Sequence, residues 1–173
     1  MAQLVLISCL IAWLLVCVIF DLRYREVPMQ WTLVPMIAAS VYALFQGQFV
    51  LVAQTAFLII ISDFKPHNRR LFLAAFVSVF AGIFDPPCLI QVMVLFLIWL
   101  LWENGALGGA DAKLLIVIAL VIGQPIVLLF IALVGGIQGV IAIFARQKKV
   151  PYIVAIFAGT SLYALNTLVL HIL

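Results

Sequence analysis

Eight runs of apolar residues follow one another along the chain, separated by short breaks that are polar or contain Gly and Pro. Within each run the apolar residues are continuous and do not alternate with polar ones, which favours membrane helices over the strands of a barrel. The pattern predicts an all-α fold, a polytopic transmembrane helical bundle. The runs cover about residues 4–20, 31–45, 49–62, 71–84, 88–102, 112–122, 126–144 and 152–171.

The lengths of the runs leave the number of membrane crossings open between about eight and six. A helix needs about 20 residues to cross ~30 Å of hydrocarbon. A run of about 14 residues rises only about 21 Å as a helix. The segment 49–84 therefore either crosses the membrane twice or forms a pair of helices that enters and leaves on one side.

Composition agrees with lipid as the main solvent of this chain. Of its 173 residues, 68% are hydrophobic and 9% are charged, whereas soluble domains are about 25% charged. The net charge of +3 is small and lies in the breaks, so we expect a lipid bilayer and no nucleic acid as partner. The three cysteines lie in apolar runs without metal-ligand spacing. We expect one transmembrane domain over residues 1–173, with no metal and no other cofactor.

The basic residues predict the orientation in the membrane. If each break returns the chain to the opposite side, four alternate breaks on one side carry all nine Lys and Arg residues, and this side is cytoplasmic by the positive-inside rule. The first run has no Lys or Arg before it, so we expect a transmembrane helix and not a cleaved signal peptide. The nine residues are Arg23, Arg25, Lys65, Arg69, Arg70, Lys113, Arg146, Lys148 and Lys149.

Acidic side chains beside membrane spans are rare, and each is a candidate functional group. The simplest interpretation of such a group is a hydrated charge at the membrane edge. Asp85 suits a turn on the outer side, and Asp63 can pair with a basic residue of its own loop. Glu26 and Glu103 stand where a loop would be hydrated.

Asp21 and Asp111 stand out from the other acids by their surroundings. Asp21 follows the first apolar run, and Pro28 predicts a turn before the next helix. Asp111 lies just before a run, after the small residues Gly108 and Gly109, which allow close backbone approach and leave room for an extended substrate. Four predicted helices separate the two aspartates, so both should lie at the same membrane face.

Two carboxylates in a partly dry site cannot both ionise readily. One would stay protonated while the other acts as a base, and together they can activate water against a peptide carbonyl. The helix N-terminus and Lys113 favour Asp111 as the ionised member. From the residues alone, an aspartyl dyad and two unrelated edge charges both remain open.

Three motifs in order resemble those of the type IV prepilin peptidases. The stretch from Asp21 to Pro28 is similar to their first motif, and the stretch from Gly108 to Leu115 is similar to their second, which is related to the GxGD signature. A third stretch, from Lys149 to Tyr152, resembles a basic-Pro-aromatic segment near the C-terminus of many members. The resemblance implies that Asp21 and Asp111 are catalytic without a metal. It implies supporting roles for Arg23, Pro28, Gly108, Gly109, Lys113, Pro151 and Tyr152.

The resemblance also implies a substrate and a place of action. The substrate would be a prepilin-like precursor with a basic leader and a hydrophobic helix, cut at the cytoplasmic face of the cell membrane. Glu26, Glu103 or Asp63 would contact the basic leader. The chain lacks the cysteine-bearing domain with which bifunctional members methylate the new N-terminus using S-adenosylmethionine, so we expect a peptidase only.

The chain departs from the family pattern at three places. Met29 stands where Asn is usual, Ala110 replaces a Gly, and the segment near 63–87 resembles an inserted hairpin. Two other functions stay open: a small proton-coupled transporter component, and a non-catalytic pilus-assembly scaffold of the same fold.

Some residues have simpler structural interpretations. We expect Trp31, Trp99 and Trp102 to be anchors at the membrane interface. Gly123 to Pro125 predicts a tight turn, and the pair Gly135–Gly136 a close helix contact.

Overall fold

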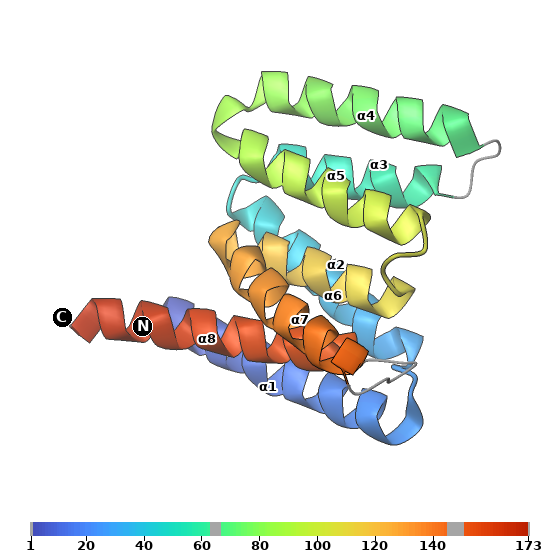
Figure 1. Ribbon diagram of the computed structural model, residues 1–173. Helices are drawn as coiled ribbons and strands as arrows, with labels where there is room; N and C mark the ends of the chain where they lie inside the picture. The colour runs from blue at the N-terminus through green and yellow to red at the C-terminus, as the bar shows by residue number, and fades with distance from the viewer. Residues whose placement is uncertain (1, 63–66, 145–150, 173) are drawn as a thin grey trace. The chain divides into compact units, whose positions relative to one another are not determined.

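The computed structural model describes residues 2–62, 67–144 and 151–172, and this part of the chain contains eight α-helices, one short 3-10 helix and no strand. Each of the eight apolar runs corresponds to one α-helix, which confirms the all-α prediction (Figure 1). The helices are α1 (Ala2–Tyr24), α2 (Met29–Phe45), α3 (Phe49–Ile61), α4 (His67–Phe84), η1 (Pro86–Cys88), α5 (Leu89–Glu103), α6 (Gly109–Ile122), α7 (Ile126–Phe144) and α8 (Tyr152–Ile172).

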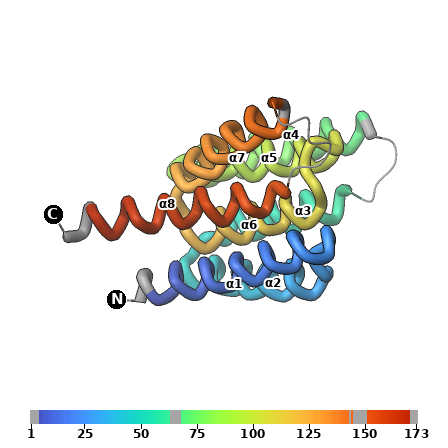
Figure 2. Tube along the Cα trace, turned by 60° about the horizontal axis from the view of Figure 1, so that its bottom comes forward, coloured from blue at the N-terminus to red at the C-terminus, as the bar shows by residue number. Residues whose placement is uncertain are grey.

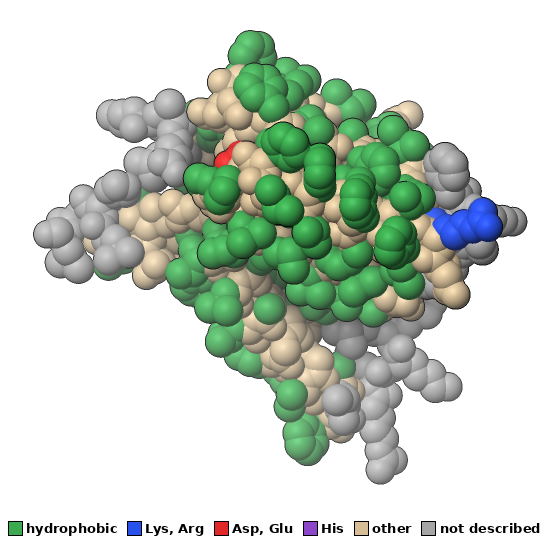
Figure 3. Space-filling model, turned by 90° about the horizontal axis from the view of Figure 1, so that it is seen from above, with side chains coloured by type: hydrophobic (Ala, Val, Ile, Leu, Met, Phe, Trp, Pro, Cys, Tyr) green, Lys and Arg blue, Asp and Glu red, His purple; other side chains and the backbone are tan. Residues whose placement is uncertain are grey.

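Three helical segments in the described part are long and apolar enough to cross a membrane: Val5–Tyr24, Pro86–Glu103 and Tyr152–Val169. Helices α2, α3 and α7 are also apolar but shorter. Large apolar side chains are exposed, as in the row Phe72, Phe76, Phe80 and Phe84 on α4, and hydrophobic side chains cover much of the face in Figure 3. Such exposure suits lipid as the solvent. The number of crossings stays a prediction.

The chain divides into two compact units, and each is described here by itself. The first contains Met1–Trp31 and Ile126–Leu173, and the second contains Thr32–Pro125. The first unit therefore combines α1 with α7 and α8. The second unit contains most of α2 together with α3 to α6.

In the first unit α8 packs along both α7 and α1, and the start of α1 and the end of α8 lie at the same end of the unit (Figure 2). Gly159 brings α8 against the backbone of α7, because a Cβ atom there would lie 2.5 Å from the Cα of Ile131. A Cβ atom at Gly135 would lie 3.0 Å from the hydroxyl of Tyr152. The close helix contact predicted at Gly135–Gly136 is thus present at Gly135.

In the second unit α4 lies over α3 and α5, and α6 packs against α5 and α3 (Figure 1). A buried cluster of Leu58, Ile61, Ala74 and Trp99 joins α3, α4 and α5. The same three helices share a buried polar link, since Nε2 of Gln54 donates to Oγ of Ser78 at 3.0 Å and to the Val92 carbonyl at 2.9 Å. Polar links of this kind hold helices together where apolar contact alone gives little preference.

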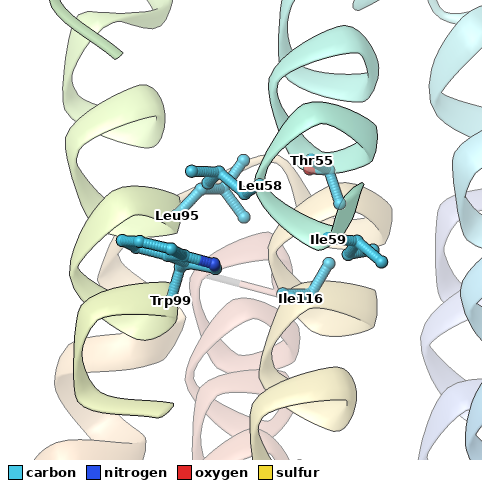
Figure 4. A pocket seen from close by; sticks show the side chains of 6 residues that line it. All are labelled: Thr55, Leu58, Ile59, Leu95, Trp99 and Ile116. Carbon is cyan, nitrogen blue, oxygen red and sulfur yellow. The ribbon is translucent and has the colours of Figure 1, made fainter. Parts of the chain in front are cut away.

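A small pocket of about 10 Å³ lies among α3, α5 and α6, which is about the room of one water molecule (Figure 4). Its walls are almost wholly apolar, so it belongs to the core of the unit. The residues that line it are Thr55, Leu58, Ile59, Leu95, Trp99 and Ile116.

The structure corrects one expectation about the tryptophans. Trp99 is only 1% exposed, and its indole Nε1 donates to Oγ of Ser62 at 2.8 Å. It is a core residue, so its prediction as an interface anchor is wrong. Trp31 is 41% exposed and Trp102 is partly buried. The turn predicted at Gly123 is present, because Gly123 ends α6 with a φ of 66°.

Candidate active site

Asp21 lies in the last turn of α1, partly exposed, and the end of this helix is fixed by an unusual backbone conformation. Arg25 has a φ of 59° and donates its N–H to the Asp21 carbonyl at 2.8 Å. This is the left-handed cap that usually takes Gly, and in another residue it costs roughly 1 kcal/mol. The cap stops α1 directly after the Asp21 turn.

The segment that follows turns at Pro28, as predicted. Helix α2 begins at Met29, and the Trp31 N–H donates to the Pro28 carbonyl at 3.0 Å. The Trp31 ring lies 5.7 Å from the Phe20 ring, centroid to centroid. The turn is therefore packed against the last turns of α1, next to Asp21.

Arg23 and Met29 flank this turn at the surface. The Arg23 guanidinium lies 5.4 Å from the centroid of the Tyr24 ring, as in a cation–π contact. Met29, at the position where the resembling family usually has Asn, is 63% exposed. Both residues are placed where a molecule arriving at the end of α1 could reach them.

Asp111 is the third residue of α6, and the connection that leads to it is tightly hydrogen-bonded. Gly105, with a φ of 71°, lies two residues after the end of α5. Its N–H donates to the Trp102 carbonyl at 3.0 Å, and the Ala106 N–H donates to the Leu101 carbonyl at 2.9 Å. These two bonds form a Schellman motif. The connection between α5 and α6 is thus a structured turn.

Gly108 is the N-cap of α6 and lies directly under the Asp111 carboxylate. A Cβ atom at this position would lie 2.9 Å from Oδ2 of Asp111, closer than real Cβ atoms come to other atoms. Gly108 has a φ of −66° and a ψ of 149°, which any residue can adopt. The glycine therefore leaves space beside the carboxylate, and its backbone conformation does not itself require glycine.

Two further predicted residues lie in the same turn. A Cβ atom at Gly109 would lie 3.4 Å from the indole nitrogen of Trp102, so the start of α6 is close to the end of α5. Lys113 is partly buried, two residues after Asp111 on the same helix. The second motif therefore folds as one compact helix start.

The third motif is described only in part. Lys149 and Val150 lie outside the described residues. Pro151 precedes α8, and its carbonyl accepts a hydrogen bond from Nε2 of Gln138 on α7 at 3.0 Å. Tyr152 places its hydroxyl against Gly135. Both residues tie the start of α8 to α7.

The structure groups the predicted site residues into two sets. The first unit holds Asp21, Arg23, Pro28, Pro151 and Tyr152, and the second holds Gly108, Gly109, Asp111 and Lys113. The pairing of the two aspartates stays a prediction. Among the described residues, no group of three or more His, Cys, Asp or Glu side chains could hold a metal ion.

Glu103 differs from the expectation of a hydrated loop charge. It is the last residue of α5, its side chain is 8% exposed, and its Oε2 lies 2.9 Å from Nη1 of Arg70. Glu26, in contrast, is exposed, and Asp63 lies outside the described residues. Because Glu103 already has a cationic partner, a direct contact with a basic leader would compete with Arg70.

Sequence reasoning missed the group around Arg70. In the sequence Arg70 indicates only the orientation in the membrane, and nothing there links it to Ser62 or Glu103. The only signal in the sequence is that Arg70 and Glu103 have opposite charges and each lies at the end of an apolar run. This signal does not predict which helix ends are neighbours in the fold.

Together the fold and the site define a class. The described residues form an all-α membrane protein that carries one aspartate in the last turn of a helix and another in the first turn of a different helix. A family model described as the type IV leader peptidase family matches residues 8–144, a range that contains both aspartates. The chain belongs to this family and is therefore a membrane protease. Comparison with curated proteins and with solved structures gave no match.

Proposed function

We propose that this protein is an aspartic-type endopeptidase that removes the leader peptide from prepilin-like precursors at the cytoplasmic face of the cell membrane. One observation carries the proposal: the Asp111 carboxylate lies in the first turn of α6, over a glycine that leaves it room, in a chain of the leader peptidase family. Asp21, in the last turn of α1, is the second catalytic carboxylate.

The reaction needs the two carboxylates in different protonation states. The ionised carboxylate takes a proton from water, and the water oxygen attacks the carbonyl carbon of the scissile peptide. The protonated carboxylic acid donates to the carbonyl oxygen. The bond between carbon and nitrogen then breaks, and a proton passes to the leaving amine.

Asp111 is the better candidate for the ionised member. The exposed N–H groups at a helix N-terminus stabilise a negative charge, typically by about 0.3–1 kcal/mol. Asp111 lies in the first turn of α6, whereas Asp21 lies at the opposite, C-terminal end of its helix.

The chain order supports a shared face for the two aspartates. Four α-helices, α2 to α5, lie between them in the chain. An even number of crossings returns the chain to the same side. Arg23 and Arg25 follow Asp21, and Lys113 follows Asp111. Because cytoplasmic loops are enriched in Lys and Arg, this face is the cytoplasmic one in our proposal.

The proposed substrate fits the surroundings of these helix ends. A hydrophobic helix of the precursor would stay in the lipid, next to the exposed apolar side chains of the protein. The basic leader would extend into the aqueous phase. Glu26 is exposed one residue after the Arg25 cap and is the described acid best placed to contact that leader.

The proposal is tested by cleavage of a prepilin-like precursor in membrane vesicles. Asp21→Asn and Asp111→Asn should each abolish cleavage. Asp85→Asn is the matched control, because Asp85 and Asp111 are separated by α5, whose 15 residues span about 22 Å. Cleavage by either Asn variant would contradict the dyad. A wild-type protein that cuts no such precursor would favour the scaffold, or, with proton-dependent flux across the vesicles, the transporter.

A further inference from the structure

A polar group outside the proposed catalytic residues joins the ends of three helices in the second unit. Nη1 of Arg70, in the first turn of α4, donates to the carbonyl of Ser62 at 2.6 Å and lies 2.9 Å from Oε2 of Glu103. Ser62 follows α3, and Glu103 ends α5. The hydroxyl of Ser62 accepts a hydrogen bond from the buried Trp99 at 2.8 Å. We refer to Ser62, Arg70, Trp99 and Glu103 as the polar latch.

The ion pair of the latch is largely shielded from water and differs from a surface ion pair. The side chain of Glu103 is 8% exposed and that of Arg70 is 20% exposed. Breaking a buried pair on one side leaves an uncompensated charge, whereas exposed pairs contribute little. Arg69, the neighbouring basic residue, is exposed. The two arginines thus have the same charge and adjacent positions but different contacts.

Glu103 connects the latch to the turn that leads to Asp111. Glu103 is followed directly by the hydrogen-bonded turn at Gly105, whose N–H groups use carbonyls of the last turn of α5. Trp102 belongs to this last turn of α5. Its indole is close to Gly109, which lies two residues before Asp111. The last turn of α5 is therefore the part against which the first turn of α6 is built. A change that moves the last turn of α5 would therefore also act on the first turn of α6.

We propose that Arg70 and Glu103 are positioning residues that hold the first turn of α6, and with it the Asp111 carboxylate, in the geometry needed for cleavage. The proposal rests on the proposed function. It gives Glu103 a role different from leader binding. A leader-binding carboxylate would act on KM, whereas a positioning residue acts on kcat, because misplacement of a reacting group by about 1 Å can lower a rate by up to about 100-fold.

Steady-state cleavage kinetics in vesicles separate these roles. Arg70→Gln and Glu103→Gln should each lower kcat by about tenfold or more with KM changed less than twofold. The double variant should lose little more than either single variant, since the two residues act as a unit. Arg70→Lys should recover part of kcat, because an ammonium group can still reach Glu103. Arg69→Gln removes the same charge and should leave kcat unchanged.

Three kinetic results would overturn the proposal. A rise in KM at constant kcat in Glu103→Gln would assign Glu103 to the leader. An equal loss in Arg69→Gln would assign the effect to the charge of the loop. Unchanged kinetics in Arg70→Gln and Glu103→Gln would show that the latch has no role in cleavage.

A second measurement does not depend on activity. In a chain with Cys9, Cys17 and Cys88 replaced by Ala, Asp111→Cys places a thiol at the site, and its alkylation rate by a water-soluble maleimide reports the local geometry. Adding Arg70→Gln should change this rate at least threefold, and adding Arg69→Gln should not. Equal rates would overturn the latch. If the wild-type protein cuts no precursor, the proposed function fails, and the alkylation rates still decide whether the latch positions residue 111.

Discussion

Replacing Gly108 by Ala tests directly whether the space beside the Asp111 carboxylate matters. The new methyl carbon would lie 2.9 Å from Oδ2 of Asp111, and ordinary contacts begin at 3.4 Å. The carboxylate must therefore move by about 0.5 Å, the difference between these distances. Because Gly108 has backbone angles that Ala adopts without strain, the substitution acts on the carboxylate and spares the chain path.

The magnitude follows from the cost of moving the side chain. Turning a side chain by about 30° from its preferred rotamer costs about 0.5–1.5 kcal/mol. If this cost is added to the activation free energy of cleavage, kcat/KM decreases by about twofold to tenfold. Stability should change little, since the gain of about 0.4–1 kcal/mol that Gly→Ala brings through the unfolded chain is offset by the displaced side chain and by Ala's being a poorer N-cap than Gly. We expect a protein of about wild-type stability that is slower.

The assay combines cleavage of a prepilin-like precursor with the thermal unfolding midpoint in detergent. Gly136→Ala is the matched control, because a Cβ atom at Gly136 meets no atom within 4 Å, and it should leave kcat/KM unchanged. Full activity of Gly108→Ala would refute the reasoning, because the Asp111 carboxylate would then not need its observed position. Loss of both activity and stability would show that Gly108 has a role in folding.

Two further substitutions test the backbone features of the first unit by thermal unfolding in detergent. Arg25→Gly should raise the midpoint relative to Arg25→Ala, because only Gly removes the left-handed cost of roughly 1 kcal/mol at a φ of 59°; equal midpoints would argue against strain there. Gly159→Ala should destabilise the protein by about 1–3 kcal/mol, because the added methyl would lie 2.5 Å from the Cα of Ile131. Gly139→Ala, which meets open space, should be neutral or stabilising, and a similar loss there would point to a general intolerance of side chains on these helices.

The helices could be predicted because lipid-facing segments are apolar throughout and their breaks carry turn residues. Pro28 and Gly123 correctly marked two turns. The ends were less well predicted, since helices continue beyond the hydrocarbon into polar residues. Helix α1 extends to Tyr24 and α4 begins at His67. The apolar runs predict an end at residue 20 for the first helix and a start at residue 71 for the fourth.

The packing between helices could not be predicted from the same pattern. A helix that is apolar all round gives no signal for which face is buried. Trp99 and Trp102 look alike in the sequence, yet Trp99 is buried against Ser62 and Trp102 faces the start of α6. The ion pair of Arg70 with Glu103 joins two helices through a contact that only the fold defines.

The candidate site was found through the types of residues and their order along the chain. The motifs placed Asp111 shortly after two glycines, but only the structure shows that these differ in their surroundings. A Cβ atom at Gly108 would crowd the Asp111 carboxylate, whereas one at Gly109 would make an ordinary contact with Trp102. The left-handed Arg25 could not be anticipated, because that position usually takes Gly or Asn.

The Schellman turn between α5 and α6 has a consequence for the entropy of the reaction. The N–H groups of Gly105, Ala106 and Leu107 are already bonded to carbonyls of the last turn of α5, so this segment has little conformational freedom left to lose when substrate binds. Fixing the backbone of a free residue costs about 1–2 kcal/mol. This segment of the enzyme avoids most of that cost. In the proposed reaction the ordering on binding then falls mainly on the precursor, so a leader that is extended before it binds should be cut with the lowest KM.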